Sequence, residues 1–155
     1  MFQIEHYKQN QLYVVSIHGE ISRGTVAQIN QHLKPLMFSM ENEKKLKGIL
    51  LECRDVEFID SAGIGMLCGK YVNLKKQKKA FALCSLKVDL MEVLHKLSLT
   101  DKINLYPSIR DAIHEMDSSA ATQEPLKIVS ENPEKNEPKK EKKPVDIFNM
   151  KLGEW

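Results

Sequence analysis

The chain has 155 residues, and 42% of them are hydrophobic, which is enough for one compact domain and a tail. Its formal net charge of +2 is too small to draw nucleic acid by bulk attraction. The amino terminus lacks a signal-peptide pattern, and no apolar run approaches bilayer length. We therefore expect a cytoplasmic protein whose partners include neither nucleic acid nor membrane.

The cysteines and histidines do not indicate a metal site. Cys53, Cys68 and Cys84 all lie within apolar runs and lack C-x-x-C spacing, which predicts reduced, buried thiols rather than disulfides. The five histidines show no pairs at the helical spacing of metal ligands; they are His6, His18, His32, His95 and His114.

The first third of the chain predicts a hairpin and then a helix. Alternating apolar residues predict strands over 2–8 and 12–18, and 19–22 is expected to leave the sheet. From Thr25, apolar residues at helical spacing predict a helix that Pro35 kinks or ends. Residues 40–47 then form a polar connection.

Strands and helices alternate over the rest of the domain. The remaining elements are predicted as a strand at 48–51, a helix at 61–77, a strand at 80–85, a helical stripe from Leu90 to Leu97, a strand at 103–106 and a last helix capped by Ser108 with Asp111 at the capping-box position. This order predicts a single α/β domain with a mixed, mostly parallel sheet, an N-terminal hairpin and about four helices.

The composition changes after Asp117. Residues 1–117 are predicted to form the domain, and 118–144 lack the apolar surface that would offset ordering entropy, so we expect a disordered linker. Residues 145–155 are apolar again, and we predict that they form a docking peptide anchored by Phe148, Leu152 and Trp155. A free terminus, or a segment that folds back on its own domain, is the alternative.

The stretch with the clearest chemistry is Asp60-Ser-Ala-Gly63, between a buried strand and a helix. Aspartate and serine are capping residues, because their side-chain oxygens accept hydrogen bonds from the first helical turn. A serine hydroxyl here lies at the positive end of a helix dipole, which would also favour a phosphate. Ser61 is therefore either a phosphate acceptor or merely a helix cap.

The surrounding motif, Phe58-Ile-Asp-Ser-Ala-Gly-Ile-Gly65 followed by Gly69-Lys-Tyr71, resembles the signature of STAS domains. More narrowly, it is similar to the small bacterial anti-sigma-factor antagonists, and the likeness covers roughly residues 1–116. The resemblance implies that a partner kinase phosphorylates Ser61. The turn that reads Gly-Glu-Leu-Asp in that family is Gly19-Glu-Ile-Ser22 here, so a hydroxyl replaces the acid.

What the resemblance implies is a regulatory binding protein that is not an enzyme and needs no cofactor. When Ser61 is unphosphorylated, it docks a kinase-type anti-sigma factor or a related switch kinase. That kinase phosphorylates Ser61 with its own ATP, and a Ser/Thr phosphatase reverses the modification. The expected partner-binding residues are Gly19, Glu20, Ser22, Asp60, Ser61, Ala62, Gly63, Ile64 and Gly65. A further partner is expected at the tail.

Two other functions stay open. The first is a STAS scaffold in another signalling or transport assembly, reached through the tail. The second, which we rank last, is a small serine hydrolase: a nucleophile elbow needs glycine two residues before and after the serine, and Ile59 and Gly63 meet half of that pattern.

The helix after Ser61 carries two further features. Gly65 and Gly69 are expected to let the helix pack closely on the sheet or let a partner approach its backbone. The lysine run at 75–79 is interpreted as a solvated helix end.

Overall fold

The computed structural model describes the backbone of residues 1–122 and the side chains of residues 1–117. The part of the predicted linker beyond Thr122 and the predicted docking peptide at 145–155 lie outside the described residues.

One five-stranded sheet organises the domain. The strands are β1 (Gln3–Gln9), β2 (Leu12–Ile21), β3 (Gly48–Ile59), β4 (Ala80–Cys84) and β5 (Asn104–Tyr106). The helices are α1 (Val26–Asn42), α2 (Ser61–Lys76), α3 (Val88–Lys96) and α4 (Ile109–Thr122), with a short 3-10 turn, η1 (Leu99–Asp101), before β5.

The strands lie in the order β1-β2-β3-β4-β5. The β1–β2 pair is antiparallel, and every other neighbouring pair is parallel. The predicted mixed sheet with one hairpin and four helices is confirmed. Because β2 to β5 run in the same direction, their carboxyl ends meet at one edge, which is where α/β proteins commonly place their sites.

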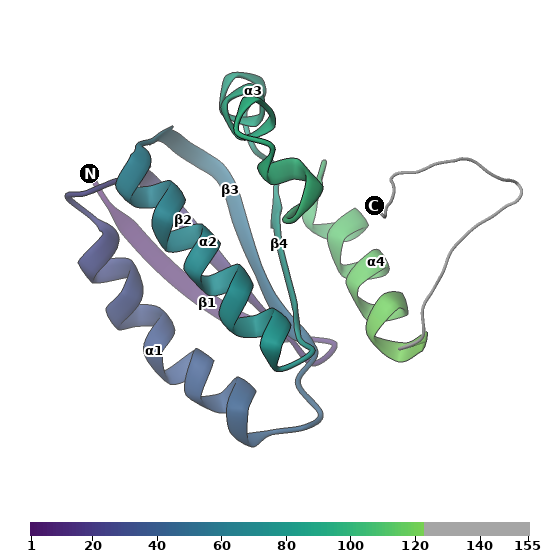
Figure 1. Ribbon diagram of the computed structural model, residues 1–155. Helices are drawn as coiled ribbons and strands as arrows, with labels where there is room; N and C mark the ends of the chain where they lie inside the picture. The colour runs from purple at the N-terminus through teal and green to yellow at the C-terminus, as the bar shows by residue number, and fades with distance from the viewer. Residues whose placement is uncertain (123–155) are drawn as a thin grey trace, which may run out of the picture.

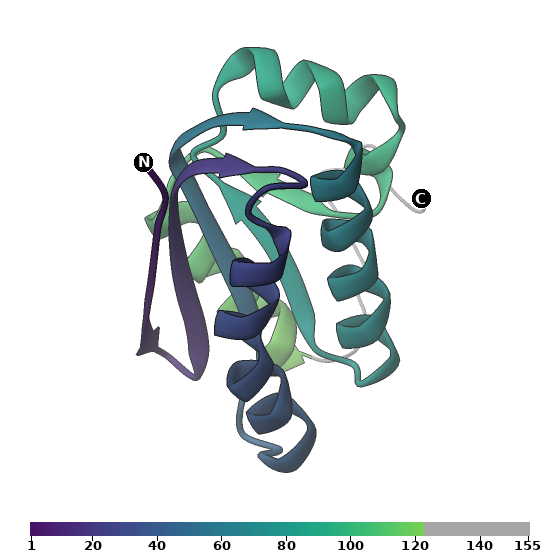
Figure 2. The same cartoon turned by 90° about the vertical axis from the view of Figure 1, so that its left-hand side faces the viewer.

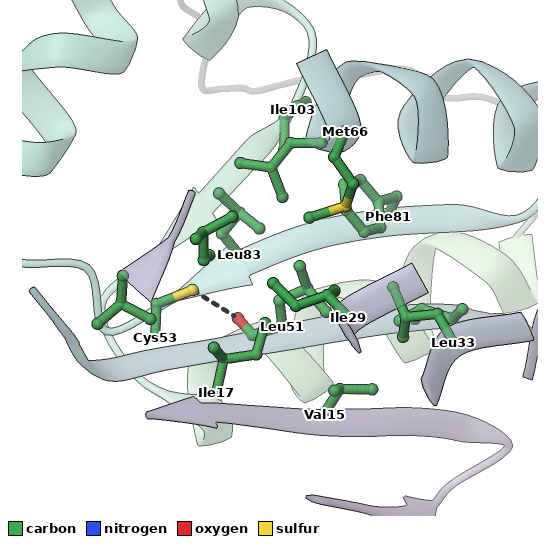
Figure 3. Packing of buried hydrophobic residues seen from close by; sticks show 14 of the residues in the cluster. Val15, Ile17, Ile29, Leu33, Leu51, Cys53, Met66, Phe81, Leu83 and Ile103 are labelled. Atoms are coloured by element: carbon green, nitrogen blue, oxygen red, sulfur yellow. Dashed lines mark hydrogen bonds between the residues drawn. The ribbon is translucent and has the colours of Figure 1, made fainter. Parts of the chain in front are cut away.

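Helices cover both faces of the sheet. In Figures 1 and 2, α1 and α2 form a layer on one face, α4 lies on the other, and α3 sits beyond the carboxyl ends of the strands. Successive residues of β3 serve opposite faces: Leu51 packs in the larger core with α1 and α2, whereas Leu50 packs in the smaller core with α4. Figure 3 shows the larger core, built from Ile29 and Leu33 of α1 against the strands. Burial on both faces explains the continuous apolar runs.

Two strands run further than predicted. Gly19 to Ile21 do not leave the sheet, since β2 continues to Ile21 and stays paired with β3, which itself continues to Ile59. The register shifts between Ser16 and His18 and again between Gly19 and Glu20. Such irregularities interrupt the two-residue alternation from which strands are predicted.

Of the two alternatives for Pro35, the end of the helix is wrong, because α1 continues through it to Asn42, and a kink stays a prediction. Leu36 and Met40, on the turns that follow, are buried, while Pro35 itself is exposed. Their burial offsets the hydrogen bond that proline cannot donate.

Two smaller predictions also need correction. Cys53 and Cys84 are free and buried, as expected, and burial raises the pKa of Cys84 to about 11, but Cys68 is only half-buried. In α3 only Leu90 and Leu94 are buried, whereas Val93 and Leu97 are exposed. The Ser108 cap is confirmed: its hydroxyl oxygen accepts from the Asp111 N–H at 3.1 Å.

Candidate functional site

The site is formed by two turns at the carboxyl edge of the sheet. Glu20 and Ile21 of β2 pair with Phe58 and Ile59 of β3, so the turns that follow these strands lie next to each other. The Asp60 N–H donates to the Ile21 carbonyl oxygen at 3.3 Å. Residues 19–25 and 58–65, far apart in the sequence, thus form one surface.

Asp60 joins the two turns through its carboxylate. Oδ1 accepts from the Gly63 N–H at 2.9 Å and caps α2, while Oδ2 accepts from the Arg23 N–H at 3.0 Å in the turn after β2. These hydrogen bonds, from Arg23 first and then Gly63, hold the pKa of Asp60 below its usual value because they stabilise the ionised form. Asp60 is therefore a structural anion within the site.

Gly63 is required by close packing. A Cβ atom at this position would lie 2.0 Å from the carbonyl oxygen of Ile21, so only glycine lets the first turn of α2 approach the end of β2. Gly63 is buried, and a partner would meet the backbone around it rather than the residue itself.

Ser61 is the first residue of α2, and it is exposed. Since Asp60 caps the helix, the expectation that Ser61 is the cap is wrong, whereas the modification of Ser61 stays a prediction. The histidine hydrogen bonds of the described residues join His6 to His32, His18 to Asp55 and His95 to Thr100, so none of them activates Ser61. In the described part of the chain, no histidine is hydrogen-bonded to the Ser61 hydroxyl.

The turn after β2 is held by its own hydrogen bonds. Ser22 is 4% exposed; its hydroxyl donates to Glu20 Oε1 at 3.0 Å, and its N–H donates to Thr25 Oγ1 at 3.0 Å. The Thr25 hydroxyl in turn donates to the Glu20 carbonyl oxygen at 2.8 Å. Ser22 thus orients Glu20, which is exposed, and does not itself face outward.

Gly19 shapes the strand below this turn. Its φ is +114°, a conformation that glycine adopts readily, and an added Cβ would lie 2.7 Å from the Met1 carbonyl oxygen. The amino terminus therefore packs against Gly19, which is half-buried.

One face of α2 forms an exposed strip with small side chains. Ser61, Gly65 and Gly69 follow one another at four-residue spacing, and all three are exposed, as is Ala62 beside them. Nothing lies within 4 Å of a Cβ added at Gly65 or Gly69, so the expectation that these glycines pack the helix on the sheet is wrong. The other expectation, that they let a partner approach the backbone, stays a prediction. Ile64 is half-buried behind the strip.

Sequence reasoning missed two exposed apolar residues, one at the end of β3 and one on this face of α2. Phe58 at the end of β3 is 49% exposed, and Val72 on α2 is 48% exposed. The exposure of Phe58 could have been predicted from its apolar neighbour Ile59: Ile59 is buried, and adjacent residues of a strand face opposite sides of the sheet. Ser61, Gly65, Gly69 and Val72, which follow one another at helical spacing along α2, are called the α2 strip below.

The described residues contain no cluster of three or more His, Cys, Asp or Glu side chains suited to a metal ion. None of the helices they form combines the length and apolar character needed to cross a bilayer.

The family model described as "STAS domain" matches residues 3–112. This chain belongs to the STAS domain family. The match takes in β1 to β5 and both turns of the site, and it ends within α4.

Solved structures show the same fold. An anti-sigma factor antagonist from Mycobacterium paratuberculosis has a TM-score of 0.66 at 22% identity, covering 75% of this chain and 94% of its own. The phosphorylated form of the Bacillus cell fate determinant SpoIIAA has 0.56 at 20%, covering 74% and 98%. A sulfate transporter family protein from Wolinella succinogenes has 0.60 at 17%, covering 75% and 92%.

Proposed function

We propose that this STAS domain is a phosphorylation-switched binding protein of the anti-sigma-factor-antagonist type, without catalytic activity of its own. Unphosphorylated, it docks a kinase-type anti-sigma factor, or a related switch kinase, through the α2 strip and the neighbouring turn at 19–24. The observation that carries this proposal is Ser61: its side chain is exposed at the start of α2, and Asp60 already provides the cap.

The charge change explains how the switch would work. A phosphate adds nearly two negative charges at Ser61. The fold tolerates them, because they lie at the positive end of the α2 dipole. A partner surface that had accepted a neutral hydroxyl would instead meet repulsion from the phosphate and from the ionised Asp60 beside it, together with a desolvation cost. The complex is then lost while the domain stays folded.

The shape of the α2 strip suits docking of a protein. Gly65 and Gly69 leave the helix backbone open to close approach, and Val72 offers an exposed apolar anchor. Ser61 lies on this strip, so one phosphate would affect the contact directly.

The similar structures support this choice of function. One is named as an anti-sigma factor antagonist, and SpoIIAA has been solved in a phosphorylated form. We further propose that the kinase uses its own ATP, that a Ser/Thr phosphatase removes the phosphate, and that the protein acts in the cytoplasm. Residues 145–155 would dock a further protein.

A second candidate function is a STAS scaffold in a transport or other signalling assembly. The likeness to the sulfate transporter family protein favours it. It predicts that partner binding does not depend on the state of Ser61.

Partner capture with ATP tests the proposal. The full chain is used as bait in a lysate of the cells that make it. We expect a kinase to be retained without ATP and to be released when ATP leads to phosphorylation of Ser61. Ser61→Ala should keep the kinase in the presence of ATP, whereas Ser39→Ala, on α1 away from the site, should release it like the wild type. Release from Ser61→Ala would exclude the switch.

A further inference from the structure

The structure brings together two lysine-rich segments that the sequence separates. Residues 41–47 end α1 and lead into β3, and residues 75–79 end α2 and lead into β4. Gly48 pairs with Ala80 at the start of these strands, so both segments lie at the amino end of the parallel sheet. This is the lower end of the molecule in Figure 1, where α1 and α2 finish.

Two of the lysines are used to hold this end together. The Lys79 ammonium donates to the carbonyl oxygens of Glu43 at 3.1 Å and Lys44 at 3.5 Å, which ties the two segments to each other. Lys47 forms an ion pair with Asp117 at the end of α4. Both side chains are half-buried.

The other five lysines are exposed, and among the described residues none of them lies within ion-pair distance of a carboxylate. They form what we call the lysine pole, consisting of Lys44, Lys45, Lys75, Lys76 and Lys78. Residues 41–47 and 75–79 together contain seven lysines and two glutamates, a formal charge of +5, whereas the whole chain carries +2. The small net charge of the chain therefore conceals a strongly positive end and a net negative remainder.

A hollow lies between the two segments. Its lining includes Lys44 and Lys78 but also Glu41. The hollow itself is therefore of mixed charge, and the net positive charge of this end comes from the exposed lysines around it.

We propose that the lysine pole is a docking surface for an anionic lipid bilayer. Clustered lysines attract an anionic leaflet as point charges, and binding at a bilayer surface needs no spanning segment.

The composition of the pole favours lipid over nucleic acid. The two segments contain neither arginine nor an aromatic residue. Arginine provides the bidentate contacts common in phosphate and base recognition, and aromatic rings provide the stacking platforms of single-strand binding. Lysines alone suit a diffuse, negatively charged surface.

The lysine pole lies away from Ser61. Ser61 begins α2 and Lys76 ends it, and the 16-residue helix is about 24 Å long. Docking of the pole on a bilayer would leave Ser61 and the start of the α2 strip accessible to another protein. The lipid proposal therefore does not depend on the proposed switch.

Vesicle sedimentation of the full chain tests the proposal. We expect co-sedimentation with vesicles of phosphatidylcholine mixed with phosphatidylglycerol, none with phosphatidylcholine alone, and weaker binding as salt is raised. The double variant Lys44→Glu with Lys76→Glu should bind the mixed vesicles at least about 30-fold more weakly.

A matched pair controls for charge and folding. Lys96→Glu with Lys102→Glu reverses two exposed lysines outside the pole, and it should bind within about twofold of the wild type. Thermal unfolding should show that both double variants remain folded. Equal sedimentation with neutral vesicles, no sedimentation with either kind, or equal losses in the two double variants would overturn the proposal. Tighter binding of duplex DNA than of mixed vesicles would overturn it too.

Discussion

At the scale of single residues, the site depends on Asp60 more than on any other side chain. Its two oxygens accept hydrogen bonds from Gly63 at the start of α2 and from Arg23 in the turn after β2. The carboxylate is therefore both a helix cap and the link between two chain segments. Because Asp60 caps the helix, the neighbouring Ser61 is not needed for capping, and its side chain is exposed.

Replacing Asp60 should loosen both turns. We expect Asp60→Ala to lower the urea midpoint of unfolding clearly, and Asp60→Asn to lower it less, because asparagine is also a good cap. Urea titrations of the two variants beside the wild type measure this. Equal midpoints for all three proteins would contradict the linking role.

The pH dependence follows from the lowered pKa of Asp60. A carboxyl group with a pKa lowered in the folded state stabilises the fold above its unfolded-state pKa, and this contribution is lost as the pH falls through the folded value. Below the usual pKa range of aspartate, the wild type should therefore lose stability more steeply than Asp60→Asn. Unfolding midpoints measured along an acid series test the slope, and parallel curves would rule out this contribution.

At the scale of elements, α2 contains glycines with opposite roles. Gly63 is in close contact with the end of β2, whereas Gly65 and Gly69 face open space. Gly63→Ala should cost about 3 kcal/mol of unfolding free energy because the helix must shift. Gly65→Ala should instead add about 0.5–1 kcal/mol, since glycine is a poor helix former. Denaturant unfolding of the two variants tests the contrast, and a stabilising Gly63→Ala would contradict the packing described.

Gly65→Ala also separates stability from docking. Its added methyl group lies on the α2 strip, so partner capture should weaken even though the domain is more stable. Unchanged capture would remove Gly65 from the proposed contact.

The helix α1 contains an internal proline that the fold tolerates. Pro35 is exposed, and its lack of an N–H leaves the Gln31 carbonyl oxygen without its helical donor. Pro35→Ala should raise the unfolding free energy by about 1–3 kcal/mol, while Lys34→Ala, at the neighbouring exposed position, should change it little. A loss of stability in Pro35→Ala would show that the proline fits a local bend.

Elements were predictable where the pattern is local. The apolar runs at 48–51 and 80–85 and the Ser108–Asp111 cap depend on neighbouring residues, and they are confirmed. The continuation of β2 through Gly19 and of α1 through Pro35 depends on pairing with β3 and on burial against the sheet. Tertiary contacts of this kind are absent from a local pattern.

At the scale of the whole molecule, the domain presents two different ends. The carboxyl edge of the sheet carries Ser61, the amino end carries the lysine pole, and the α2 strip runs along α2 from Ser61 towards the pole. The motif resemblance made the first end predictable. The second was hidden, because residues 41–47 and 75–79 meet only through the pairing of β3 with β4.

The distance between the two ends predicts independent behaviour. A negative charge placed at one end of α2 should have little effect at the other, given a separation beyond the Debye length at physiological salt. Ser61→Asp should therefore bind mixed anionic vesicles within about twofold of the wild type. A large loss of vesicle binding in Ser61→Asp would show that the two surfaces are coupled.

The central claim is that Ser61 carries a reversible phosphate. The most direct measurement is the intact mass and phosphosite map of the protein purified from its own cells under several growth conditions, beside Ser61→Ala. We predict a species heavier by one phosphate, mapped to Ser61 and missing from the variant. A chain that is unmodified under every condition, or modified only at another residue, would contradict the switch and favour a STAS scaffold.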